Sequence, residues 1–296
     1  MSKLSPALKA LIMAPSARNG AVGAPHGMRD VYGRIAADAA RHKLGTRPWL
    51  AFAAAATFTL NSPDSLAVLH GVASAGKGAV AATQTAELMR DVGLKCISFN
   101  GIPRTINCLN EFGAALPPTL AASLSTTPQR ALTPDNLDAA LARGRRAFDS
   151  VYAPLTEKLL DRLARAHPDL PVHILGSHYA PLLADPPLPP PSPAADALAA
   201  ARTGRLLTSA VAVACLRAQT GVGPQVLSHV YGLRKAFENG SWRRGWVREP
   251  DTDEGQLVRW FTGDEGGEWI LRSVDSIIEA LGGSNFAAGS GKQSKL

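Results

Sequence analysis

The chain has 296 residues, of which 46% are hydrophobic and 6% aromatic, and it carries a formal net charge of +7 and three cysteines. This length is sufficient for a large buried core in one or two domains. The composition argues against three classes: no apolar run is long enough for a membrane helix, the first residues are not typical of a secretory signal, and the cysteine spacing fits neither a disulfide framework nor a zinc site.

The basic residues are dispersed rather than gathered in one stripe. Local clusters stand at 143–146 and at 241–246, where Trp242 and Trp246 flank Arg243 and Arg244. Such a segment can stack bases, but no nucleic-acid-binding motif accompanies it. We therefore expect tryptophans that pack on the fold beside solvated arginines, and no nucleic-acid partner.

Apolar residues recur with helical spacing from residue 28 onward. Pro63, Pro103 and Pro224 each stand where a first helical turn tolerates proline. No stretch alternates with a period of two, so the predicted class is all-α. The predicted helices are 28–43, 47–60, one beginning at 63, 83–96, 103–115, one from a cap at 133–135 to about 166, 194–219, 224–237 and 268–281.

The organisation predicted from these elements is one helical domain, 28–281, between an extension, 1–27, and a flexible tail, 282–296. The proline-dense segment 186–193 predicts a stiff, extended connector. Segments 65–75 and 225–233 resemble each other, because each follows an apolar helix and a turn with proline and each carries a histidine. This similarity predicts two repeat-like halves, about 45–125 and 194–240.

No motif calls for a cofactor or a metal. The segment 71–77 fits G-x-x-x-x-G-K, but Gly78 replaces the magnesium-binding Ser or Thr and no strand precedes it. His167, His173 and His178 do not share a helical face, so they do not form a ligand set.

Cys96 and Cys108 flank a break in the chain at 101–103. If the two joined helices fold back, the thiols come close and Arg104 is the local group that can activate a thiolate. The alternative is that both cysteines are small buried apolar residues. Redox chemistry at this pair therefore stays one hypothesis.

Three segments, 99–109, 177–183 and 224–233, are similar to helical segments of the AhpD-like/carboxymuconolactone decarboxylase superfamily. The resemblance implies an all-α fold of packed helix pairs that forms a homo-oligomer. Peroxidase members carry a Cys-x-x-Cys pair before the helix histidine. Here the corresponding positions are Val222 and Gln225, so the dithiol is absent. Arg202, Thr203 and Gly204 stand where the relay carboxylate is expected.

Decarboxylase-like members need no cysteine, and the resemblance then implies acid/base chemistry on a small acidic or acyl metabolite. His229 is the carried-over catalytic candidate, and His70 is its equivalent in the first half. Arg104 and Asn107 are the candidates for binding a carboxylate. The alternatives are a non-catalytic binding or structural protein, in which both histidines bond inside the core and Arg104 caps a helix, or a redox protein that uses Cys96 and Cys108.

The tripeptide Ser294-Lys295-Leu296 is typical of a peroxisomal import address, and we expect the glycines at 282–283 and 289–291 to give it a loose tether. The expected partner is therefore the import receptor, and the expected location is the peroxisomal matrix.

Overall fold

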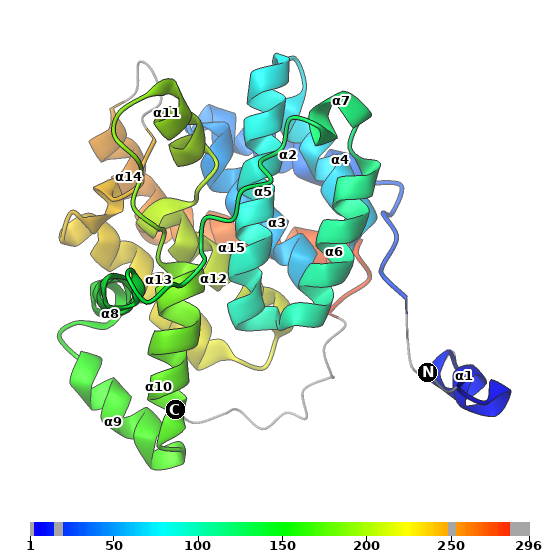
Figure 1. Cartoon of the computed structure of the whole chain (residues 1–296). Coiled ribbons are helices and arrows are strands. Elements are labelled where there is room, and N and C mark those ends of the chain that lie inside the picture. The colour runs from blue at the N-terminus through cyan, green and yellow to red at the C-terminus, as the bar shows by residue number, and fades with distance from the viewer. Residues whose placement is uncertain (1–2, 15–19, 248–252, 285–296) are drawn as a thin grey trace.

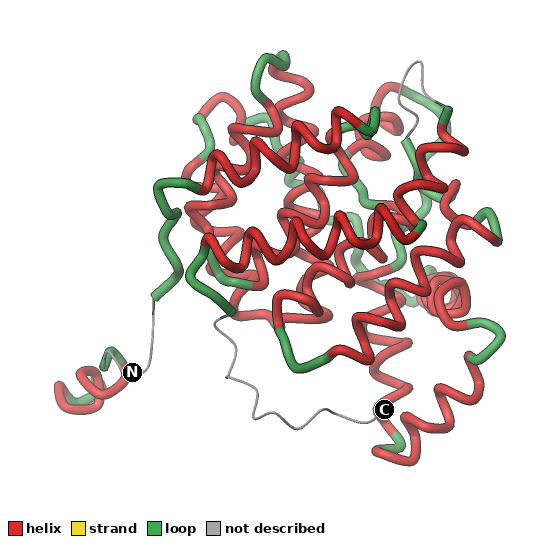
Figure 2. The backbone as a smooth tube through the Cα atoms, turned by 180° about the vertical axis from the view of Figure 1, so that it is seen from behind, coloured by secondary structure: helices red, strands yellow, loops and turns green. Residues whose placement is uncertain are grey.

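The computed structural model confirms the all-α prediction. It describes residues 3–14, 20–247 and 253–284, and the described part consists of helices joined by loops (Figure 2). The tripeptide 294–296 lies outside the described residues. Among the residues described, no helix is both long and apolar enough to cross a membrane.

The first half of the described chain contains α1 (Pro6–Ile12), α2 (Met28–Arg41), α3 (Thr46–Thr59), α4 (Pro63–Ser74), α5 (Ala79–Asn100), α6 (Ile102–Ala115) and α7 (Pro118–Ala121). The second half contains α8 (Leu137–Tyr152), α9 (Thr156–Ala166), α10 (Asp169–His173), the π-helical η2 (Ile174–Leu183), α11 (Pro193–Ala200), α12 (Gly204–Gln219), α13 (Gly223–Glu238), the short 3₁₀ turn η3 (Ser241–Arg243), α14 (Glu254–Thr262) and α15 (Asp264–Ala280). α1 lies apart from the body and buries none of its residues (Figure 1).

Two very apolar helices, α3 and α12, pack along each other at the centre of the fold. Residues 51–56 of α3 are completely buried, and most of α12 is buried as well. Alanine is the most frequent residue in both helices, and its small side chain suits close helix packing. The helices α5, α13 and α15 pack against this pair and present one apolar face each.

The predicted helix from 133–135 to about 166 is two helices in the structure. α8 ends at Tyr152, and α9 begins at Thr156 after Ala153 and Pro154. Proline cannot continue a helix, and the residue before it favours extended backbone, as Ala153 does with a ψ of 144°. The predicted helix 194–219 is also two helices, α11 and α12, separated by residues 201–203, and α12 begins at Gly204, which has a positive φ.

The predicted repeat has a partial structural counterpart. α3 and α12 are each followed within two residues by one with positive φ, Asn61 and Thr220, and then by a helix that contains a proline in its first turn and a histidine further along. The two halves stay a prediction, because this shared connection is short.

Candidate functional site

The candidate site is a cavity of about 330 Å³ on the α8 side of the fold. It is enclosed by the C-terminal half of α5, α8, η2, the first half of α12, α13 and the start of the proline-rich connector 186–193. Its apolar walls are formed by Phe99, Ala147, Val151, Leu183, Leu188 and Ala212. This size and lining are those of a site for a small organic ligand.

Two close backbone contacts shape the cavity. A side chain on Gly144 would meet the backbone of Ala180 at 2.6 Å, so α8 and η2 touch there. Gly204 has a φ of +68°, and a Cβ on it would lie 2.6 Å from the carbonyl oxygen of Gly245. Glycine at these positions brings η2 and the 244–245 loop against the helices that carry the polar lining.

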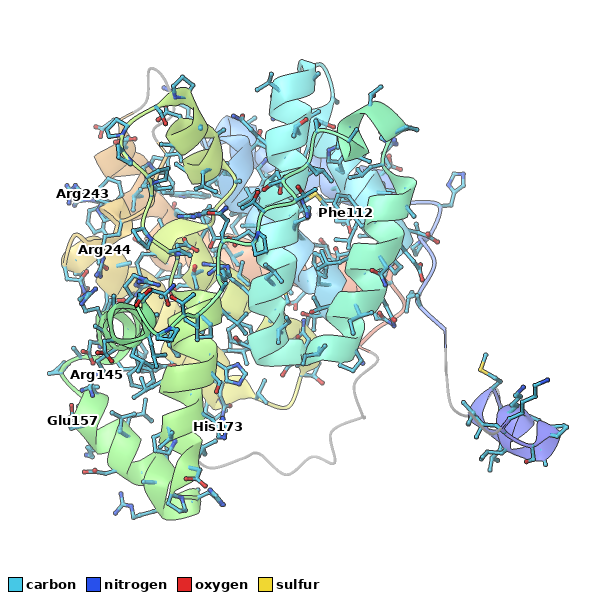
Figure 3. The ribbon with its side chains drawn as sticks, in the orientation of Figure 1. Phe112, Arg145, Glu157, His173, Arg243 and Arg244 are labelled. Carbon is cyan, nitrogen blue, oxygen red and sulfur yellow. The ribbon has the colours of Figure 1, made fainter. Side chains whose placement is uncertain are left out.

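Five arginines supply the charge of the lining: Arg143, Arg146, Arg202, Arg205 and Arg244. Arg146 and Arg244 are exposed, and Figure 3 shows Arg244 at the outer edge of the molecule. The side chains of Arg143 and Arg202 each have one buried nitrogen, Nε and Nη2 respectively, without a hydrogen-bond partner among the described residues. Buried donors are normally satisfied. The described protein atoms supply no acceptor for these two nitrogens, so both are available to an acceptor that enters the cavity.

His229 contributes a neutral imidazole. Its Nε2 lies 3.4 Å from the Tyr152 hydroxyl, its ring meets Phe99 edge-on, and its Nδ1 is buried without a partner among the described residues. Burial, with a smaller contribution from the charge of Arg205, lowers the pKa of His229 to about 4. The imidazole is therefore uncharged at neutral pH.

Arg205 links the cavity to the backbone of its neighbours. Its guanidinium donates to the Ser150 hydroxyl at 2.5 Å, the Ser209 hydroxyl at 2.6 Å, and the carbonyl oxygens of Ser150 and Gly232, both at 3.1 Å. Burial lowers the pKa of Arg205 to about 10, so it keeps its charge at neutral pH. No carboxylate of the described chain pairs with it.

A buried ionic cluster holds the connector in place. Lys95 donates to Asp185 at 2.8 Å and to the Leu183 carbonyl oxygen at 3.0 Å, and Arg130 donates to Asp91 at 2.5 Å and to Asp185 at 3.0 Å. Burial alone would raise the pKa of Asp185, but Lys95 and Arg130 outweigh it and lower the pKa to about 2. Arg202 then donates to the Pro186 carbonyl oxygen at 2.6 Å, so the connector starts as part of the cavity wall.

Of the residues predicted from sequence, His229 lines this cavity and the others lie elsewhere. His70 places Nε2 3.0 Å from the Ala82 carbonyl oxygen and its ring against Phe112 of α6, which Figure 3 shows well away from Arg244 at the left edge. Arg104 donates to the carbonyl oxygen of Thr59 at the end of α3, and Asn107 donates to the Asn61 side chain at 3.4 Å. The contacts of His70 and Arg104 are those of core and helix-end residues.

The cysteines are arranged differently from the hypothesis that pairs Cys96 with Cys108. All three are buried and free, and the Sγ of Cys96 lies 3.5 Å from that of Cys215 on α12. The Sγ of Cys108 instead contacts the Asn61 side chain at 3.9 Å. Burial raises the pKa of Cys96 well above its usual range and that of Cys108 to about 12, which opposes thiolate formation.

None of the five cavity arginines is predicted as a site residue from the sequence. Arg143 and Arg146 belong to a short basic cluster, Arg202 stands where the family's relay carboxylate is expected, and Arg205 opens an otherwise apolar helix. A charged residue at the start of an apolar, fully packed helix is the signal that was available. In the described part of the chain, no three His, Cys, Asp or Glu side chains are grouped as metal ligands.

Comparisons with protein-family models, with curated proteins and with solved structures found no significant match to this chain.

Proposed function

We propose that the protein binds a small acidic or acyl metabolite in the arginine-lined cavity and that His229 transfers a proton to or from it. The observation that carries the proposal is the combination in one cavity of apolar walls with Arg143 Nε, Arg202 Nη2 and His229 Nδ1, three buried nitrogens without partners in the described structure. Apolar walls favour an apolar body, and guanidinium donors favour an anionic group.

The neutral ring of His229 carries one proton and one lone pair, so it can donate or accept. With a pKa of about 4 it is a weak base in the free protein. A bound anion beside it favours the imidazolium form and raises its pKa, so the ligand itself makes His229 a stronger base. Arg205 is then available to stabilise negative charge that develops on the substrate.

A second candidate is a binding protein without catalysis. The observation that favours it is the environment of His229, which has Tyr152, Phe99 and Arg205 as neighbours and no carboxylate in hydrogen-bonding contact within the described structure. A catalytic histidine is usually oriented by such a group. The same cavity then holds an anion without transforming it.

We further propose that the chain is a divergent AhpD-like protein, delivered to the peroxisomal matrix as a homo-oligomer. The all-α fold and segments 99–109, 177–183 and 224–233 support the family, and Ser294-Lys295-Leu296 supports the address. The redox alternative has less support, because Cys96 and Cys108 are both buried with raised pKa values.

The test is a binding and turnover experiment with octanoate as the probe, because the cavity holds roughly ten non-hydrogen atoms. We expect octanoate to raise the melting temperature of the wild-type protein. The control is His70→Gln, a buried histidine outside the cavity, which leaves octanoate binding unchanged, whereas His229→Gln weakens it. Absence of stabilisation by octanoate, or an equal loss in both variants, contradicts the proposal.

Catalysis is tested separately, by following a panel of acyl and carboxylated compounds by proton NMR in the presence of protein. Turnover that disappears in His229→Gln supports the enzyme. Binding without turnover of any compound identifies the second candidate, and light scattering of the same samples gives the oligomeric state.

A further inference from the structure

The cavity carries more positive charge than a simple carboxylate can balance. Asp91 and Asp185 lie within the ionic cluster and are paired with Lys95 and Arg130, so these four charges sum to zero. Arg143, Arg202 and Arg205 make no ion pair within the described structure, and each of them lines the cavity. Three partly or fully buried cations are therefore left without an ion-pair partner in the described structure, and only Arg202 feels Asp185 and Asp91 of the cluster at longer range.

These cations also act on one another. Burial is the main cause that lowers the pKa of both Arg143 and Arg202. Arg146 and Arg130 lower that of Arg143 further, and Arg130 and Arg143 lower that of Arg202, whereas Asp185 and Asp91 act in the opposite direction on Arg202. Placing like charges together at a partly buried surface is unfavourable unless an anion joins them. The arrangement is typical of a site whose ligand supplies the missing negative charge.

The free donors have the right number and kind for a phosphoryl group. Arg143 Nε and Arg202 Nη2 are buried and without partners in the described structure, and the exposed Arg146 lines the same cavity. A phosphate monoester carries a charge of about −1.5 to −2 at pH 7 and three acceptor oxygens. A carboxylate carries one charge and two oxygens, which leaves two of the three cations unbalanced.

We propose that the ligand of this cavity is a phosphate monoester of an apolar body, with the phosphate at Arg143 and Arg202 and the apolar body against Phe99, Val151 and Ala212. This inference rests on the proposed function, because it names the class of anion that the same cavity takes. Arg202 is fixed at the connector by Pro186, whereas His229 is fixed against Phe99 and Tyr152. The two groups thus have separate neighbours, and the apolar body lies between the phosphate and the imidazole.

The experiment compares octyl phosphate, octanoate and inorganic phosphate as ligands of the full-length protein by isothermal titration calorimetry, below the micellar concentration of octyl phosphate. We expect octyl phosphate to bind at least about tenfold more tightly than octanoate, since it adds one or more charge-assisted hydrogen bonds. We expect inorganic phosphate to bind more weakly than octyl phosphate, because it leaves the apolar walls unfilled.

The decisive variant is Arg143→Gln, with Arg145→Gln as its matched control. Arg145 is two positions along the same helix, and it is paired with Asp149 and with Glu157, which Figure 3 shows beside it. We expect Arg143→Gln to lower the affinity for octyl phosphate about tenfold and the affinity for octanoate by a smaller factor. Arg145→Gln is expected to change neither affinity. Arg143 is half-buried, so its replacement leaves the fold intact, which circular dichroism checks.

Four outcomes overturn the inference. Equal affinity for octanoate and octyl phosphate excludes a preference for phosphate but is consistent with the proposed function. If neither probe binds, the proposed function itself is wrong. If inorganic phosphate binds as tightly as octyl phosphate, the apolar body is not bound in the cavity. Binding to phosphatidate vesicles without binding of monomeric octyl phosphate identifies a membrane surface instead of the cavity.

Discussion

The Tyr152 hydroxyl lies 3.4 Å from Nε2 of His229, at the point where the end of α8 meets α13. The two residues are far apart in sequence, and burial raises the pKa of the tyrosine while it lowers that of the histidine. Both groups are therefore neutral at physiological pH. His229, which lines the cavity, therefore has an uncharged hydrogen-bonding neighbour in Tyr152.

The protein is expected to become less stable as the pH is lowered, because of His229. Its pKa of about 4 in the folded protein lies below the ordinary value of 6.5, so the unfolded chain takes up the proton first as the pH falls. The contribution of His229 to the free energy of unfolding is fully present above pH 6.5. It is lost as the pH falls from 6.5 to 4, which lowers the free energy of unfolding by up to about 3 kcal/mol. Urea unfolding of wild type and His229→Gln across this range measures the effect, and parallel curves for the two proteins would contradict it.

Removal of the Arg205 charge is expected to raise the pKa of His229. Arg205→Met takes away the positive charge that adds to the effect of burial. Histidine C–H chemical shifts, followed by NMR against pH, measure the change. The variant also loses about 2 kcal/mol of stability, because the carbonyl oxygens of Ser150 and Gly232 lose their donor. An unchanged or lower pKa of His229 counts against this prediction.

Asp185→Asn is expected to destabilise the protein by about 3–5 kcal/mol, because it leaves Lys95 and Arg130 short of a counter-charge in the interior. The folded-state pKa of Asp185, about 2, is below its ordinary value of 3.8, so its contribution is present above pH 4 and is lost as the pH falls toward 2. Chemical denaturation at pH 7 and at pH 3 checks both statements. A smaller decrease in the free energy of unfolding for Asp185→Asn than for the exposed control Asp264→Asn would refute them.

The cysteine thiols are expected to react slowly in the native protein. Cys96 and Cys108 are buried and their pKa values are raised, so little thiolate is present at pH 8. Titration with a disulfide reagent, with and without denaturant, measures this directly. Rapid native-state reaction that disappears in Cys96→Ser or Cys108→Ser would revive the redox hypothesis.

Deletion of residues 294–296 is expected to abolish peroxisomal import. A fluorescent protein fused to the N-terminus reports punctate signal for the full chain and diffuse signal for the deletion. The test is made in cells that lack the intact protein, so that a partner subunit cannot carry the variant in. Punctate signal without Ser294-Lys295-Leu296 disproves the address.

Sequence pattern alone determined the class of the fold and most of its helices. Residues 28–41 and 223–238 repeat their apolar side chains at helical spacing, 46–59 is a continuous apolar run of helical length, and proline or glycine stands at the ends, so local chemistry is sufficient. The candidate His229 came from the resemblance of segment 224–233 to AhpD-like proteins and not from periodicity. The break at Pro154 was missed because the apolar pattern continues through it, although the proline itself was visible.

Only the tertiary structure decided which charged residues share a cavity. Arg143, Arg202 and Arg205 come from α8, the residues before α12, and α12, and no local rule relates their spacing. The same holds for Cys96, because its close partner Cys215 lies on a helix more than a hundred residues away in sequence. It also holds for His70, which the sequence similarity groups with His229 but which lies apart from it in the structure. Periodicity depends on neighbours along one helix, whereas a binding site depends on how helices pack, and packing is set by contacts between distant segments.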